Sequence, residues 1–194
     1  MPKLGMEPIR KAALVNATIF EIGRVGSLDV TVSQIAKRAG MSSALAHHYF
    51  GSKEEIFLAA MRHVLTLYGA EVRGALALAD GPEGRLRGVL TASFSPASFR
   101  REVVGAWLNF WVLAQTVPEA KRLLAVYQRR LRSNLLAGLR PLAGDRSGAI
   151  ADGLGALIDG LYLREVLKSG PPDGEGAVRM ALDYLDGQIR GDGQ

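Results

Sequence analysis

The chain has 194 residues, enough to bury a hydrophobic core as one domain or two small ones without disulfides or metals. Hydrophobic residues make up 48% of it and charged residues 22%, a balance that excludes collagen-like and disordered chains. The absence of cysteine excludes disulfides, thiol nucleophiles and cysteine-ligated zinc, and it fits a reducing, cytoplasmic location.

Lysine and arginine together number 24 against 19 aspartates and glutamates, a net charge of +5. This excess favours a polyanionic partner but does not establish one. The sequence does not open with a basic segment and an apolar signal core, and its apolar stretches fall short of the ~20 residues of a membrane span. We therefore expect neither export nor a membrane partner.

Apolar residues recur with a period of 3.6, which predicts an all-α fold. Pro8 can begin a first helix that ends near Gly23 to Gly26. Short helices are expected at about 32–39 and 43–50, and a longer one from Ser52 to about Ala79. Further breaks between helices are expected at Asp80-Gly81-Pro82, Ser95-Pro96, Val117-Pro118, Pro141 to Gly148, and Gly170 to Gly174.

This order of elements suggests a small N-terminal head followed by a larger helical body. We place the boundary in the helix that begins at Ser52, with a head at 1–52 and a C-terminal helical bundle at 53–194.

The region 31–50 has the pattern of a helix-turn-helix. Thr31 and Gln34 can form a capping box, Gly40 permits the sharp turn, and Ser42 can cap the second helix. Small and hydrogen-bonding side chains on that helix suit the major groove of DNA. A helical hairpin of an ordinary α-protein would show a similar pattern, so the pattern alone leaves both readings open.

Lys53 lies in the first turn of the long helix, behind a second capping box from Ser52 to Glu55. The helix dipole disfavours a cation there unless an anion such as a phosphate binds as well. The alternative is a solvated lysine balanced by Glu54 and Glu55. The candidates for DNA contact are Thr31, Ser33, Tyr49 and Lys53 at phosphates, and Ser42, Ser43, Ala44, His47 and His48 at or near the groove floor.

Gly40-Met41-Ser42 together with 48–56, His48-Tyr49-Phe50-Gly51-Ser52-Lys53-Glu54-Glu55-Ile56, resembles the signature of tetracycline-repressor-type (TetR) transcriptional regulators. The resemblance implies a homodimer with an N-terminal helix-turn-helix, a helical body that binds a small molecule, and release of operator DNA on ligand binding. Ala46 and His47 depart from the commonest form of the signature.

A closer resemblance covers nearly the whole chain and includes 1–10, 43–50, 107–111, 129–135 and 156–164. These stretches are similar to the choline-responsive repressors of glycine-betaine synthesis, in which His47 is no longer unusual. The resemblance implies control of genes for glycine-betaine synthesis or transport by a choline-like effector. The alternative is a TetR-type regulator of another operon, such as one for efflux or catabolism, with a different apolar or cationic effector.

An aromatic stripe on one predicted helix offers a cage for such an effector, because its members are spaced at i, i+3 and i+4. A quaternary ammonium has no N–H to donate, so aromatic faces and one carboxylate suit it. Aromatic residues at this spacing also serve as ordinary core, and Asp159 can instead face solvent or pair with Arg164. The candidates for ligand contact are Trp107, Phe110, Trp111, Tyr127, Asp159 and Tyr162.

Small and large apolar residues alternate in 150–161, which allows close approach of helices. With the last helix, this segment can form a four-helix bundle between two subunits, although a core within one chain would use the same residues. The candidates for the dimer interface are Gly153, Leu154, Leu157, Leu161, Leu182 and Leu185.

An enzyme is the main alternative from another class. His47 and His48 are adjacent and project apart on a helix, unlike an i, i+4 metal pair. We find no glycine-rich phosphate loop, no Gly-x-Ser-x-Gly elbow and no dinucleotide fingerprint. We therefore expect a regulator with no catalytic residues, cofactor or metal.

Overall fold

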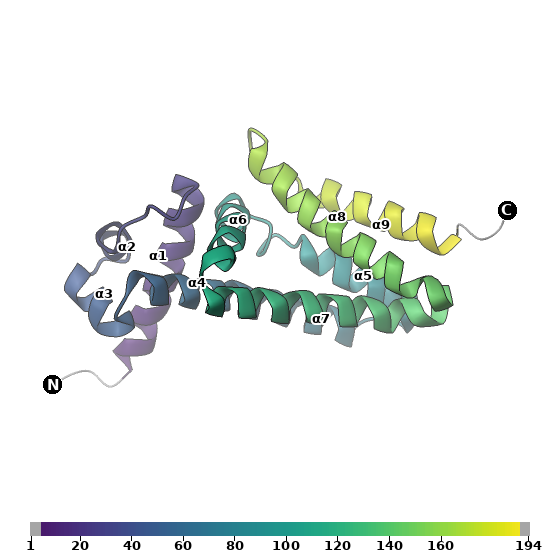
Figure 1. The fold of residues 1–194 in the computed structure, drawn as a ribbon, viewed down its shortest axis with the longest axis horizontal. Coiled ribbons are helices and arrows are strands. Elements are labelled where there is room, and N and C mark those ends of the chain that lie inside the picture. The colour runs from purple at the N-terminus through teal and green to yellow at the C-terminus, as the bar shows by residue number, and fades with distance from the viewer. Residues whose placement is uncertain (1–4, 191–194) are drawn as a thin grey trace. The chain divides into compact units, whose positions relative to one another are not determined.

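The computed structural model describes residues 5–190, which form nine α-helices, one 3-10 helix and no strand (Figure 1). The predicted all-α class is confirmed. In chain order the helices are α1 (Met6–Val25), α2 (Val32–Arg38), α3 (Ser43–Phe50), α4 (Lys53–Ala77), α5 (Gly81–Ser93), α6 (Arg101–Thr116), α7 (Pro118–Ala143), the 3-10 helix η1 (Gly144–Arg146), α8 (Ser147–Leu167) and α9 (Gly174–Arg190).

The chain divides into two compact units, and α4 and α7 each contribute to both. Unit 1 comprises Met1–Val64 and Arg101–Leu123, and unit 2 comprises Leu65–Arg100 and Leu124–Gln194. Unit 1 therefore extends beyond the head expected at 1–52, because it also takes in the start of α4 and the whole of α6.

In unit 1, α6 lies beside α1 because glycines let the two backbones approach (Figure 1). A Cβ on Gly105 would lie 3.1 Å from the backbone of Gly23, and a Cβ on Gly23 would overlap the backbone of Glu102. This approach depends on residues 82 positions apart in sequence (105 − 23), which is why local pattern did not place α6 with the head.

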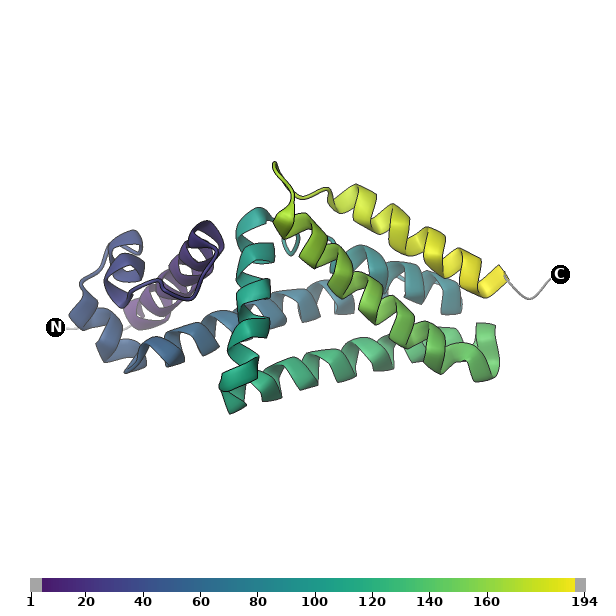
Figure 2. The same ribbon diagram turned by 45° about the horizontal axis from the view of Figure 1, so that its top comes forward.

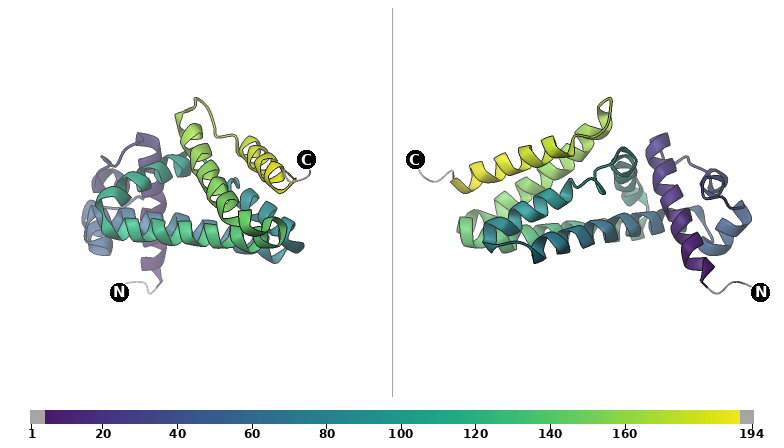
Figure 3. Two further views of the ribbon diagram at one scale, coloured as in Figure 1. Left: turned by 45° about the vertical axis from the view of Figure 1, so that its right-hand side comes forward. Right: turned by 180° about the vertical axis from the view of Figure 1, so that it is seen from behind.

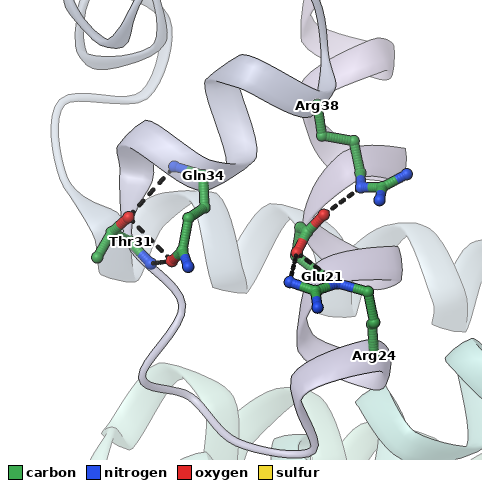
Figure 4. Close-up of polar contacts among 5 residues, drawn as sticks. All are labelled: Glu21, Arg24, Thr31, Gln34 and Arg38. Atoms are coloured by element: carbon green, nitrogen blue, oxygen red, sulfur yellow. Dashed lines mark hydrogen bonds and ion pairs between the residues drawn. The ribbon is translucent and has the colours of Figure 1, made fainter.

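The predicted caps of the helix-turn-helix are present. The Thr31 hydroxyl accepts a bond from the Gln34 N–H at 3.2 Å, and the Thr31 N–H donates to the Gln34 amide oxygen at 2.7 Å (Figure 4). Gly40 has φ +69°, a left-handed conformation that favours glycine. The Ser42 hydroxyl caps α3 by accepting from Leu45 N–H at 3.2 Å. Local sequence therefore fixes the turn and the helix starts in this motif.

The second capping box is only half formed. Ser52 Oγ accepts from Glu55 N–H at 3.1 Å. The return bond that we expected, from Ser52 N–H to the Glu55 carboxylate, is replaced by a bond from Ser52 N–H to the carbonyl of Phe50 at 2.8 Å. The Ser52 N–H is thus satisfied within the turn that joins α3 to α4.

In unit 2, α8 lies beside α9, and α5 also contacts α9 (Figures 2 and 3). Gly153 on α8 faces Tyr184 on α9, where a Cβ would collide with the tyrosine hydroxyl. The break expected at Pro141 to Gly148 is present, since α7 ends at Ala143 and α8 begins at Ser147. Only two helical residues follow this proline, so its missing N–H disturbs little of the helix.

None of the helices in 5–190 combines the length and the apolar character that a membrane crossing requires.

Candidate DNA-binding head and ligand site

All nine predicted DNA contacts keep accessible surface in unit 1. Three of them, Ser43, Tyr49 and Lys53, are half-buried, while Thr31, Ser33, Ser42, Ala44, His47 and His48 are exposed. Behind this surface Ala46 of α3 is fully buried, as are Ile35 and Ala36 of α2. The two helices thus have the apolar inner side and the polar outer side that reading DNA requires. Contact of these residues with DNA stays a prediction.

His47 has a defined tautomer in this arrangement. Its Nδ1 lies 3.1 Å from the carbonyl oxygen of Gly51, and because a carbonyl can only accept, Nδ1 carries the proton. Nε2 of a neutral His47 is then an acceptor, suited to the amino groups of cytosine or adenine in the major groove. Contact of His47 with the groove stays a prediction.

Tyr49 has two basic neighbours on α1 that the sequence analysis missed. Arg10 Nη1 donates to the Tyr49 hydroxyl at 3.4 Å, and Lys11 Nζ lies 5.9 Å from the ring centroid. Because the hydroxyl accepts from Arg10, its own proton remains available for a phosphate oxygen. Arg10 and Lys11 lie on an otherwise ordinary amphipathic helix, so nothing in their spacing indicated this contact with Tyr49.

Three tyrosines gather in unit 2, from α4, α7 and α8. The rings of Tyr68 and Tyr127 meet edge to face with centroids 5.4 Å apart. The Tyr68 hydroxyl lies 3.3 Å from Ser93 Oγ, and the Tyr162 hydroxyl donates to the Ser93 carbonyl at 2.7 Å. Ser93 thus holds two tyrosines of the cluster. Tyr68 was not predicted, because nothing in its own spacing distinguishes it.

Asp159 is the carboxylate of this cluster. It is partly buried, and burial raises the pKa of its carboxyl from 3.8 to about 6. Burial also raises the pKa values of Tyr68, Tyr127 and Tyr162, and the nearby charge of Asp159 adds to each increase. Within 5–190 no hydrogen bond or ion pair to Asp159 is found, so the pairing with Arg164 that we considered is not formed. The charge of Glu71 also raises the pKa of Tyr162, but this carboxylate accepts hydrogen bonds from the hydroxyls of Ser95 and Ser98. The cluster therefore combines aromatic rings with Asp159, an anion for which the described part of the chain offers no hydrogen-bonding or cationic partner.

The ligand candidates fall into two groups. Tyr127, Asp159 and Tyr162 belong to unit 2, whereas Trp107, Phe110 and Trp111 belong to unit 1.

On α6 the centroid of the Trp107 ring lies 6.5 Å from that of Phe110 and 6.4 Å from that of Trp111. Phe110 has no accessible surface, so it packs in the core of unit 1, and its contact with a ligand stays a prediction. Trp107 is 5% exposed and Trp111 is half-buried, and their contact with a ligand stays a prediction.

Several interface candidates serve the core of unit 2 instead. Leu154 and Leu185 are 0% exposed and Leu161 is 5% exposed within the single chain, so they offer a second subunit almost no surface. Gly153 is needed for the approach of α8 to Tyr184. The assignments of Leu154, Leu161 and Leu185 are corrected, because an amphipathic pattern does not say which partner covers it, whereas Gly153 is half-buried and stays a prediction. Leu157 and Leu182 keep partial exposure and stay predictions.

An exposed apolar stripe on α8, which the sequence analysis did not single out, lies at Ala156, Leu163 and Leu167. The spacing of 7 and then 4 residues puts all three on one face of the helix. Leu163 is 43% exposed and Leu167 75% exposed. Large apolar side chains in such a row are typical of a surface that a partner covers.

The head and the body define a helix-turn-helix transcriptional regulator. Residues 9–60 match the family described as "Bacterial regulatory proteins, tetR family", and residues 82–190 match "BetI-type transcriptional repressor, C-terminal". The chain is 47% identical over 192 residues to the HTH-type transcriptional regulator BetI of Brucella suis biovar 1, covering 98% of this chain and 97% of that protein. The chain therefore belongs to the TetR family and has a BetI-type C-terminal domain.

Solved structures share this fold. A regulator from Pseudomonas aeruginosa PAO1 is 28% identical with a TM-score of 0.80, covering 97% of this chain and 94% of that one. A regulator from Saccharomonospora viridis, solved in complex with choline, is 21% identical with a TM-score of 0.79, covering 92% and 96%. At 21% identity the second likeness establishes the fold alone.

Proposed function

We propose that this regulator represses genes of glycine-betaine synthesis or transport and releases its operator when choline, or a related trimethylammonium compound, binds unit 2. The observation that carries the ligand assignment is the unpaired Asp159 carboxylate beside Tyr68, Tyr127 and Tyr162. As an operator-binding protein it acts where the chromosome lies, in the cytoplasm.

The chemistry of this cluster suits a quaternary ammonium better than a primary one. A trimethylammonium group cannot donate an N–H bond, and it gains roughly 0.5 to 2 kcal/mol from each aromatic face it contacts. Because the hydroxyls of Tyr68 and Tyr162 are engaged at Ser93, rings rather than hydroxyls are left for a ligand. Asp159 supplies a negative charge that balances the cation, whereas the nearby carboxylate of Glu71 is engaged by the hydroxyls of Ser95 and Ser98.

The relatives support the same ligand class. The curated relative carries the name BetI, and the regulator from Saccharomonospora viridis was solved with choline. A regulator of another operon with a different apolar or cationic effector is the alternative, and the buried anion favours a cationic effector over a neutral apolar one.

We further propose that the active form is a homodimer with a two-fold axis. Two heads are needed to read an inverted repeat with half-sites spaced by whole helical turns. The exposed stripe at Ala156, Leu163 and Leu167, together with the half-buried Leu157 and Leu182, supplies an apolar face for a second copy of this chain.

Release requires that the ligand prefer the form whose heads do not match the operator. A tenfold loss of operator affinity corresponds to a preference of ~1.4 kcal/mol.

Calorimetry with choline and with ethanolamine, its primary-amine counterpart, tests the ligand assignment. We expect choline to bind and ethanolamine to bind at least about tenfold more weakly, since the methyl groups of choline contact the rings, whereas an ammonium among the rings would have only Asp159 to accept its three N–H groups. No choline binding at millimolar concentration, in a protein that still binds its operator, would leave a TetR-type regulator with another effector.

A further inference from the structure

Glu21 is a charged side chain in the core of unit 1, where it is only 4% exposed. Its Oε2 accepts two bonds from Arg24, at 3.0 Å from Nε and 2.6 Å from Nη2, and its Oε1 accepts from Arg38 Nε (Figure 4). Burial would raise the pKa of this carboxyl, but the hydrogen bonds from Arg38 and Arg24 outweigh it and hold the pKa below its usual value. Glu21 is therefore ionised and fully paired at neutral pH.

The two arginines connect different parts of the head. Arg24 lies on α1, three residues from Glu21, so its bonds stay within one helix. Arg38 is the last residue of α2, 17 positions away, and its guanidinium also lies 3.7 Å from the centroid of the Phe20 ring on α1. The end of α2 is thus held to α1 by an ion pair and by a ring contact at once.

This attachment bears on DNA recognition because α2 carries Ser33 and begins at the Thr31 cap, two of the predicted phosphate contacts. A rigid α2 holds these groups at a fixed distance and angle from α3, which enters the groove. Arg38 itself retains 39% exposure of its side chain, so its position on a basic helix would equally suit a phosphate contact.

We infer that Glu21 and Arg38 are positioning residues for operator recognition, and that Arg38 braces α2 against α1 instead of binding a DNA phosphate. This inference rests on the operator binding proposed above. A brace and a phosphate contact differ in a measurable way, because each phosphate contact releases counterions and contributes about one unit to the slope of log affinity against log salt.

The test compares Arg38→Gln with Arg24→Gln, which removes the same charge from the same carboxylate without freeing α2. The probes are an operator duplex selected from a random pool and a scrambled duplex of equal length. We expect Arg38→Gln to lower operator affinity about tenfold, through loss of a coupled pair, while the salt slope and the affinity for the scrambled duplex stay unchanged. Arg24→Gln should stay within about twofold of the wild type on both probes, because it acts within α1 only.

Further variants guard against simple unfolding. Glu21→Gln should match Arg38→Gln on the operator, and the double variant should lose little more than either single one, as expected for one coupled pair. Arg38→Lys keeps a positive charge beside Glu21 but loses the planar contact with the Phe20 ring, so it should restore operator affinity only in part. Melting temperature and choline affinity, measured on each variant, show that the fold and unit 2 remain intact.

A salt slope lowered by about one unit in Arg38→Gln would assign Arg38 to a phosphate and overturn the inference. Unchanged operator affinity in Arg38→Gln, an equal loss in Arg24→Gln, or an equal loss on the scrambled duplex would overturn it as well. If instead the wild-type protein selects no duplex from the pool, the proposed function fails, and the two failures are thereby distinguished.

Discussion

The affinity for choline should depend on pH through Asp159. Burial holds the pKa of this carboxyl at about 6 in the ligand-free protein, so Asp159 is about nine-tenths ionised at pH 7 and about one-tenth ionised at pH 5. The ionised carboxylate of Asp159 attracts a cation, whereas the neutral carboxyl does not. If only that form binds choline, the dissociation constant rises about tenfold between pH 7 and pH 5 and is nearly constant above pH 8.

Calorimetry between pH 5 and pH 8 measures this dependence, with Asp159→Asn as the matched variant. The tyrosines around Asp159 remain neutral throughout this range, and the three histidines of the chain, His47, His48 and His63, lie in unit 1. Asp159→Asn should bind choline weakly and without pH dependence, and the affinity of the wild type should fall toward that of the variant as the pH drops below 6. A pH-independent wild type, or an Asp159→Asn variant that binds as tightly at pH 8, would refute the role of Asp159 as counter-ion.

The raised pKa of Asp159 also predicts how the stability of the folded protein depends on pH. Because the pKa of Asp159 is higher in the folded state than its ordinary 3.8, the folded protein binds more protons between these values. The stability that protonation provides is full below about pH 4 and is lost as the pH rises through about 6. Asp159→Asn should therefore melt at a higher temperature than the wild type at pH 7.5 and at a similar temperature at pH 4.

Three further predictions concern the head, the approach of α1 to α6, and the dimer. Lys53→Ala should weaken binding to all DNA sequences alike and lower the salt slope by about one in anisotropy titrations, and an unchanged slope would remove Lys53 from the phosphates. Gly23→Ala should lower the free energy of unfolding by about 1–3 kcal/mol in urea titrations, since its methyl group would overlap the backbone of α6. Gly74 has open space around it, so Gly74→Ala should instead raise the free energy of unfolding by up to about 1 kcal/mol. Equal effects of the two substitutions would contradict the overlap expected at Gly23. Leu163→Glu should yield monomers in sedimentation whereas Leu78→Glu, at an 89% exposed residue, should not; a dimeric Leu163→Glu protein would exclude this face of α8.

The parts of the head that local chemistry determines could be predicted from the sequence. A capping box spans four residues and a left-handed glycine depends on its own φ, so Thr31, Gln34 and Gly40 were identified from spacing alone. The same holds for α3, whose predicted bounds agree with the structure.

The parts that depend on distant packing could not be predicted. The Glu21 to Arg38 pair joins residues 17 positions apart, and Tyr68 joins Tyr127 from another helix. A leucine on an amphipathic helix shows that some partner covers it, but the periodicity does not distinguish the chain's own core from a second subunit. This is why Leu154 and Leu185 were assigned to the interface although both are fully buried within the chain.

Fluorescence anisotropy of a labelled operator duplex, titrated with choline at pH 7.5, tests the central claim most directly. The wild-type protein should bind the duplex and release it at choline concentrations that also saturate the calorimetric site, while Asp159→Asn should stay bound to the duplex at those concentrations. Choline binding without any loss of operator affinity, or release that persists in Asp159→Asn at the same concentrations, would contradict the account.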